Sequence, residues 1–106
     1  MKELISCISF FERFEADILA QRKTITLRDE TESHFISGQE LSVYTFESKR
    51  KFCNIHIENV TTVAFDALDQ SHAQQENMTL TQLKELIQEI YPGIRELFLI
   101  EFRLVK

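Results

Sequence analysis

The sequence of 106 residues contains only two glycines, one proline and no tryptophan. Gly38 and Gly93 stand far apart, so neither GxGxxG nor GxxxxGK[ST], the glycine-rich loops that bind phosphates, can be written. P-loop and Rossmann nucleotide-binding enzymes are therefore excluded. The scarcity of glycine and proline also argues against long flexible linkers, and the length suits a single domain over residues 1–106.

Cysteine is equally sparse. Cys7 and Cys53 form no CxxC motif, which indicates reduced thiols in a cytoplasmic protein rather than a disulfide scaffold. Cys53 and His56 are three residues apart in a predicted strand, so their side chains would point to opposite faces. A closed zinc site needs four converging ligands and a catalytic one three. We therefore expect no metal site.

The chain also lacks long apolar runs and any excess of positive charge. No segment approaches the ~18 apolar residues of a membrane span, and the N-terminal segment carries charges where a signal peptide is apolar. We expect a soluble cytoplasmic protein with no membrane partner. The net charge of −5 opposes binding to a long duplex, whereas a neutral nucleoside is electrostatically easier to accept.

Two segments show helical periodicity. In 9–21, Ser9 and Glu12 predict a capping box, the helix is expected to end near Gln21 or Arg22, and an apolar stripe contains Phe10, Phe14 and Ile18. In 79–93, Thr79 and Gln82 predict a second capping box and Pro92-Gly93 a stop, with a buried stripe formed by Leu83, Leu86, Ile87 and Ile90.

Strand patterns occupy much of the remainder. Period-two alternation marks 23–28 and the C-terminal segment, and 41–47 and 50–60 predict a hairpin around Ser48-Lys49. The segment 60–65 either extends the second hairpin strand or forms another strand. The order predicts an α+β fold: a curled, mainly antiparallel sheet or small barrel of about five or six strands, flanked by two or three helices.

Lys23 and Thr26 lie in the first strand-like segment. A threonine hydroxyl is a poor nucleophile unless a base takes its proton, and a lysine can be that base only when desolvation or a nearby cation lowers its pKa. Arg22 and Arg28 supply such charge. The plain interpretation of the alternation is an ordinary solvent-exposed strand face, since polar strand faces are common and catalytic ones are rare. The catalytic hypothesis further requires Lys23 to lie in the turn before the strand, because residues 23 and 26 of a regular strand face opposite sides.

Glu76 lies three residues before the predicted cap at Thr79. An acidic side chain there is ordinarily stabilised by the helix dipole. Proton donation would instead require apolar burial that keeps the carboxyl protonated. Spacing alone does not distinguish Glu76 from the other acidic residues.

Several segments together resemble a known family: FFERFEADILAQRKTITLRDE, HFISGQEL, FCNI, SHAQQENMTLTQLKELIQEIYPG and IEF. They are similar to the small bacterial ASCH-domain N4-acetylcytidine amidohydrolases over nearly the whole chain. The resemblance implies a PUA-like fold, a small β-barrel with helices packed around it. It also implies hydrolysis of N4-acetylcytidine to cytidine and acetate, without a metal or organic cofactor.

The resemblance further implies roles for single residues. Thr26 matches the family's nucleophile, Lys23 its general base and Glu76 its proton donor. For the oxyanion of such a reaction, backbone N–H groups beside Thr26 or the Arg28 side chain are candidate donors, and Arg28 is also a candidate to bind the substrate. The wider ASCH signature G-x-K-x-x-E-x-R fits with two departures. Thr26 stands where the signature has glutamate, and Gln21 stands where it has glycine.

Two alternatives stay open. Thr26 could position a water molecule for direct attack on the substrate instead of attacking itself. The chain could also be a non-catalytic RNA-binding module, since PUA-like domains often bind RNA; its acidic charge and its three chemical side chains favour the enzyme. The expected state is a monomer or small homo-oligomer.

Overall fold

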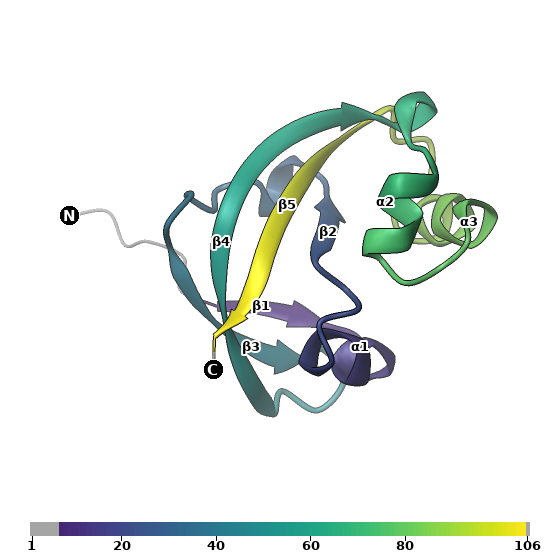
Figure 1. The fold of residues 1–106 in the computed structure, drawn as a ribbon. Helices are drawn as coiled ribbons and strands as arrows, with labels where there is room; N and C mark the ends of the chain where they lie inside the picture. Colours follow the sequence, from purple (N-terminus) through teal and green to yellow (C-terminus); the bar gives the residue numbers. More distant parts are fainter. Residues whose placement is uncertain (1–6, 106) are drawn as a thin grey trace.

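The computed structural model describes residues 7–105 and is built on one five-stranded sheet (Figure 1). The strand order is β1-β3-β4-β5-β2, in which β1 and β3 are parallel and all other neighbours antiparallel. The strands are β1 (Cys7–Phe10), β2 (Ile25–Arg28), β3 (Glu40–Thr45), β4 (Lys51–Ala64) and β5 (Glu96–Val105). The predicted α+β class and strand number are confirmed. The segment 60–65 mainly extends β4.

The sheet curls strongly but does not close. β4 and β5 form a long bent ribbon, with β3 and β1 on one side of it and β2 on the other (Figure 1). The register shifts between Ile57 and Asn59 in β4, an irregularity that increases bending. Among the described residues, no strand ladder joins the edge strands β1 and β2. The expected barrel is therefore open at this seam, which side chains of both strands occupy instead.

The helices are α1 (Glu15–Leu19), α2 (Gln70–Gln75) and α3 (Leu80–Ile90), with short 3-10 turns at Glu12–Phe14, Glu30–Glu32 and Phe65–Ala67. The capping box predicted for α3 is confirmed: Thr79 Oγ1 accepts from the Gln82 amide at 3.1 Å, and the Gln82 side chain accepts from the Thr79 amide at 2.9 Å. Leu83 and Ile87 are buried as expected, but Leu86 is half-buried and Ile90 is exposed.

The prediction for the first helix was wrong at both ends. Ser9 caps no helix, because it lies in β1 opposite Tyr44 of β3. The four residues of β1 also fit a period of two, and pairing with β3 buries Ile8 and Phe10 in the core. Helical structure therefore begins only at Glu12, and α1 ends at Leu19, before the expected end near Gln21 or Arg22.

Two apolar clusters form the core. One lies within the curl of the sheet and contains residues such as Phe10, Ile18 and Ile100. The other joins the sheet to α2 and α3, through residues such as Leu27 and Leu83. β2 contributes to the junction of the two clusters, and its side chains are consequently well buried. None of the described helices has the length and hydropathy needed to cross a membrane.

Candidate functional site

A cavity of about 240 Å³ opens where the two apolar clusters meet. Its wall is contributed by β1, β2, the 3-10 turn before α1, the β3–β4 turn, the end of α2 and the α3 helix. All four site residues expected from the sequence line it: Lys23, Thr26, Arg28 and Glu76. The rest of the lining is mostly apolar and aromatic, so the cavity combines a few polar groups with a dry surround, as ligand pockets commonly do.

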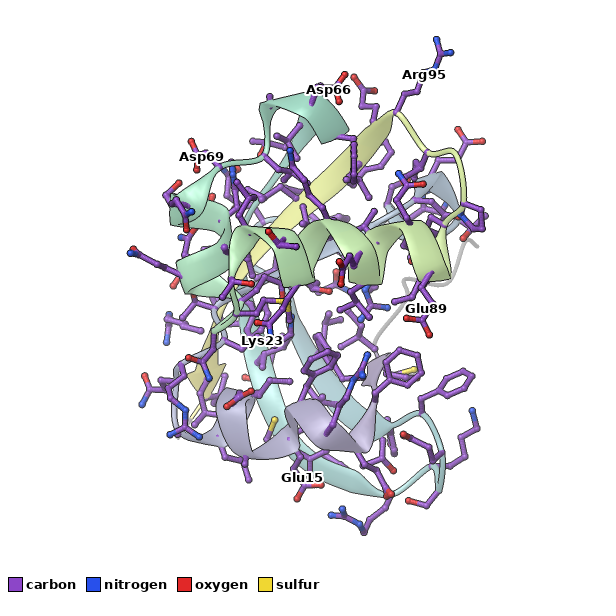
Figure 2. The ribbon with its side chains drawn as sticks, turned by 90° about the vertical axis from the view of Figure 1, so that its right-hand side faces the viewer. Glu15, Lys23, Asp66, Asp69, Glu89 and Arg95 are labelled. Atoms are coloured by element: carbon purple, nitrogen blue, oxygen red, sulfur yellow. The ribbon has the colours of Figure 1, made fainter. Side chains whose placement is uncertain are left out.

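Lys23 enters the cavity from the turn between α1 and β2. Gln21 adopts a φ of 62°, and the amides of Arg22 and Lys23 both donate to the Asp17 carbonyl, at 2.9 and 3.1 Å. The turn places Lys23 before β2, which begins at Ile25, and so outside the pleat as the sequence argument required. Figure 2 shows Lys23 between α3 and α1, where only 3% of its surface is exposed.

Glu76 reaches the same point from the end of α2. It is the C-cap of that helix, and the residue is 4% exposed. The Thr24 amide donates to the Gln75 carbonyl at 2.8 Å, which holds the two segments together. The Glu76 carboxylate accepts a hydrogen bond from Lys23 Nζ. Glu76 is therefore not simply an acid stabilised by the dipole of the following helix, because its side chain makes a buried contact with Lys23.

The surroundings of the Lys23 amine favour its uncharged form. Burial lowers the pKa of Lys23 well below its ordinary value, and the Arg28 charge lowers it further, while Asp17 partly opposes both. Nζ also donates to the Ile25 carbonyl at 3.0 Å. If the proton crosses the hydrogen bond to Glu76, the ion pair becomes an amine and a carboxylic acid with the same total number of protons. A buried site makes this neutral pair accessible.

Thr26 and Arg28 point from the same face of β2 because they are two residues apart. Arg28 Nε donates to Thr26 Oγ1 at 2.9 Å. The guanidinium is held by two further acceptors, the Ser9 carbonyl across the seam at 2.8 Å and the Glu32 carboxylate. Its centre lies 4.9 Å from the centre of the Phe10 ring. A fixed cation therefore contacts the threonine hydroxyl oxygen.

Lys23 and Thr26 line the same cavity but are not hydrogen-bonded to each other. Among residues 7–105, none joins Lys23 Nζ to Thr26 Oγ1, since the amine is engaged by Glu76 and Ile25. In ligand-free sites such contacts often form only when substrate binds. The arrangement brings together a hydroxyl, an amine that can be neutral, a carboxyl and a fixed cation.

The histidines and cysteines do not assemble into a site. Within the described part of the chain, no cluster of three or more His, Cys, Asp or Glu side chains could hold a metal ion. His72 instead completes the N-terminal cap of α2, where its Nδ1 accepts from the Asp69 amide at 3.2 Å. Cys7 is exposed and Cys53 half-buried, and both are free thiols.

Sequence reasoning missed several residues of the cavity. Glu32 contacts Arg28 four residues earlier in the chain, a spacing that could have suggested the pair. Ser9 contributes its backbone carbonyl, for which the side chain gives no signal. Phe46 and Tyr91 also line the cavity, and no local pattern marked either residue as part of a site.

The chain is closely similar to curated bacterial proteins. It is 59% identical over 102 residues to the N(4)-acetylcytidine amidohydrolase of Shewanella baltica, covering 96% of this chain and 97% of that protein. The protein of the same name from Shewanella putrefaciens is 59% identical over 99 residues, covering 93% and 96%. No protein-family model matches the chain.

Solved structures support the fold. The ASCH domain from Lactobacillus crispatus superposes with a TM-score of 0.75 at 16% identity, covering 93% of this chain and 79% of that one. A protein from Enterococcus faecalis gives a TM-score of 0.77 at 19% identity, covering 99% and 79%. At such low identity the likeness concerns the fold alone, and it confirms the expected ASCH architecture.

Proposed function

Because the chain belongs to the family of N(4)-acetylcytidine amidohydrolases, we propose that it hydrolyses N4-acetylcytidine to cytidine and acetate. The observation that carries the proposal is the buried contact between Lys23 and Glu76, in a cavity that also holds the Thr26 hydroxyl. Amide hydrolysis needs a nucleophile, a base to activate it and an acid to protonate the departing nitrogen. Side chains suited to all three tasks line this cavity.

In the proposed reaction, Lys23 starts as the neutral amine and Glu76 as the carboxylic acid. Lys23 takes the proton of Thr26, and the threonine oxygen attacks the acetyl carbonyl carbon. The resulting oxyanion lies beside the positive charge of Arg28, which stabilises it. Glu76 then protonates N4 as the carbon–nitrogen bond breaks, which releases cytidine and leaves acetyl-Thr26.

The second half of the reaction restores the site. After cytidine departs, Lys23 is an ammonium ion and Glu76 a carboxylate, an ion pair made from the former neutral pair. The carboxylate takes a proton from water, which attacks the acetyl-threonine. Lys23 returns its proton to the threonine oxygen as acetic acid leaves, and the acid ionises to acetate in solution. Every proton is carried by a side chain of the cavity, so the proposed reaction uses neither a metal ion nor an organic cofactor.

Arg28 stabilises the deprotonated nucleophile as well as the oxyanion. Its Nε hydrogen bond to Thr26 Oγ1 lowers the free energy of the alkoxide that deprotonation produces. Because Glu32 and the Ser9 carbonyl hold the other guanidinium nitrogens, the group needs little reorganisation during the reaction. We therefore assign Arg28 to positioning and charge stabilisation.

Chromatography after incubation with N4-acetylcytidine tests the proposal. The purified chain should convert the nucleoside to cytidine, and Glu76→Gln should not, because an amide cannot supply the proton. A second experiment measures RNA binding as a function of salt concentration, which tests the alternative function. Absence of cytidine from the wild-type reaction, together with salt-dependent RNA binding, would favour the non-catalytic RNA-binding module instead.

A further inference from the structure

Two apolar side chains stand exposed at the rim of the cavity. Phe46 is 54% exposed and Ile90 is 41% exposed, and both line the cavity. Leu19 and Ile36 are comparably exposed but do not line it. Single exposed apolar side chains are common on protein surfaces, so it is the location of Phe46 at the cavity that distinguishes it from Leu19 and Ile36. The position of Phe46 therefore raises the question of what its ring binds.

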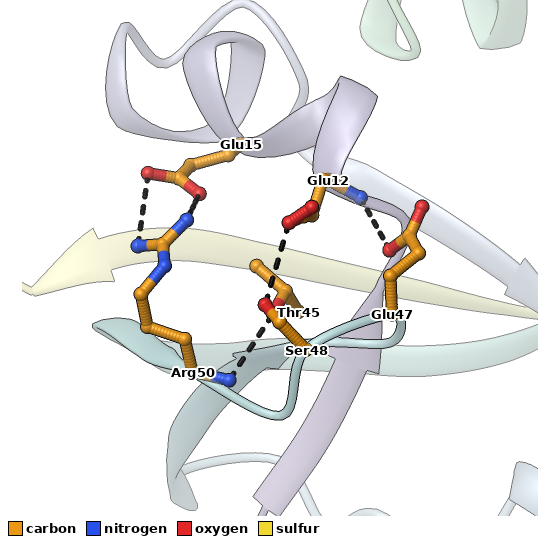
Figure 3. Close-up of polar contacts among 6 residues, drawn as sticks. All are labelled: Glu12, Glu15, Thr45, Glu47, Ser48 and Arg50. Atoms are coloured by element: carbon orange, nitrogen blue, oxygen red, sulfur yellow. Dashed lines mark hydrogen bonds and ion pairs between the residues drawn. The ribbon is translucent and has the colours of Figure 1, made fainter.

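Phe46 lies in the β3–β4 turn, which several contacts tie to the neighbouring chain. The Phe46 amide donates to the Phe10 carbonyl at 2.7 Å. Figure 3 shows three contacts between this turn and the helical segment from Glu12: the Glu12 amide donates to Glu47 at 2.9 Å, Ser48 donates to Glu12 at 3.3 Å, and Arg50 pairs with Glu15 at 2.5 Å. The backbone that carries Phe46 is thus held in place beside β1.

The ring itself is also oriented. Phe11 meets it edge to face, with centroids 5.5 Å apart and an angle of 72° between the planes. Lys49 Nζ lies over the ring, 4.7 Å from its centre. Phe46 is therefore an oriented aromatic surface of a mostly apolar cavity that Lys23 and Thr26 also line.

The size of the cavity limits how much of a ligand it encloses. Its volume of about 240 Å³ lies below the ~300–1,000 Å³ of pockets that enclose drug-sized ligands. A cavity of this size suits the acetyl group and the pyrimidine ring better than the whole nucleoside. A planar base bound there would meet an aromatic ring of the rim.

On the basis of the proposed function, we propose that Phe46 stacks on the pyrimidine ring of the substrate and directs its N4-acetyl group toward Thr26. The part of the ring that lines the cavity receives the base. Stacking uses the π-face that every base has and requires no hydrogen bond from the protein. Phe46 is thus a specificity residue that selects acylated amines carried on a flat aromatic ring.

Substitutions at position 46 test the inference, because a stacking residue should affect KM much more than kcat. Alanine substitution of an aromatic side chain that stacks on a base weakens binding by ~1–3 kcal/mol, so Phe46→Ala should raise KM for N4-acetylcytidine roughly 5- to 150-fold. The chemical step involves other side chains, so kcat should change much less. Phe46→Tyr should retain a KM close to wild type, whereas Phe46→Leu, which is apolar but not aromatic, should resemble alanine.

Two further variants separate stacking from general effects. Ile36→Ala removes another exposed apolar side chain, away from the cavity, and should leave KM unchanged. Arg50→Ala releases one tie of the turn to α1 and should raise KM, by less than Phe46→Ala does. Thermal unfolding of the position-46 variants should match wild type, because the side chain is half exposed.

The outcomes distinguish this inference from the proposed function. Hydrolysis by the wild type with an unchanged KM in Phe46→Ala, or equal KM values in Phe46→Leu and Phe46→Tyr, would overturn the stacking role alone. If the wild type does not hydrolyse the nucleoside, calorimetric titration with N4-acetylcytidine decides: weaker binding by Phe46→Ala supports the stacking role, and equal or absent binding overturns it.

Discussion

Replacement of either Lys23 or Glu76 alone should destabilise the protein far more than replacement of both together. Their side chains are 3% and 5% exposed and hydrogen-bonded to each other. Removal of one partner from a buried ion pair leaves an uncompensated charge, at a cost of ~3–5 kcal/mol, whereas joint replacement by apolar residues of similar volume is often neutral. We expect this pattern for Lys23→Met, Glu76→Leu and the double variant.

Urea unfolding followed by circular dichroism measures these free energies. At about 4 °C per kcal/mol for a domain of this size, a single replacement that costs ~3–5 kcal/mol lowers Tm by roughly 12–20 °C. The double variant should be at least ~2 kcal/mol more stable than the sum of the single effects predicts. The cycle is run near neutral pH, and each variant is first checked for native circular dichroism.

The exposed pair Arg50–Glu15 is the matched control, since its side chains are 53% and 25% exposed. The same cycle there should yield almost no coupling, because solvent screens exposed pairs. Single effects at Lys23 and Glu76 that add within ~0.5 kcal/mol would refute the reasoning, since the buried contact would then contribute nothing of its own.

Four further predictions concern the site and its turn. Lys23→Arg should be nearly as inactive as Lys23→Ala, because a guanidinium stays charged at working pH, and near-wild-type turnover would exclude the general-base role. Wild-type kcat/KM should follow a bell-shaped pH profile. Activity should rise at a pH well below that at which an ordinary lysine deprotonates, because the pKa of Lys23 is lowered. On the alkaline side, activity should fall when the Lys23–Glu76 pair loses the proton that it holds. Dialysis against a strong chelator should leave turnover unchanged. A loss of turnover that added zinc reverses would contradict this and point to the histidines as metal ligands. Gln21→Gly should raise the free energy of unfolding by up to ~1 kcal/mol, because φ is 62° at this position; a lower Tm would show that the glutamine side chain itself stabilises the turn.

The parts of the fold that depend on local pattern could be predicted from the sequence. The capping box of α3 and the turn after β3 follow from neighbouring residues, and both were confirmed. The helix predicted from Ser9 was wrong at its start, because the apolar residues of this segment fit a short strand as well as a helix. Only the pairing of β1 with β3, a contact distant in sequence, decides between them.

The candidate site divides in the same way. Thr26 and Arg28 share a strand face by simple alternation, so their proximity could be expected. The position of Lys23 depends on a turn in which a glutamine adopts a left-handed φ, a conformation that the sequence does not signal. The contact of Lys23 with Glu76 spans 53 residues, and only the resemblance suggested it. Spacing alone could not have identified it.

The measurement that tests the central claim most directly is kcat/KM for N4-acetylcytidine in Thr26→Val. Valine keeps the shape of threonine but removes the hydroxyl, and Thr26→Ser is the control that keeps it. If Thr26 is the nucleophile, Thr26→Val should lose at least ~10³-fold in kcat/KM while Thr26→Ser stays active. A Thr26→Val protein with native circular dichroism and activity within tenfold of wild type would contradict the account, because the Thr26 hydroxyl would then be needed neither to attack the substrate nor to position a water molecule.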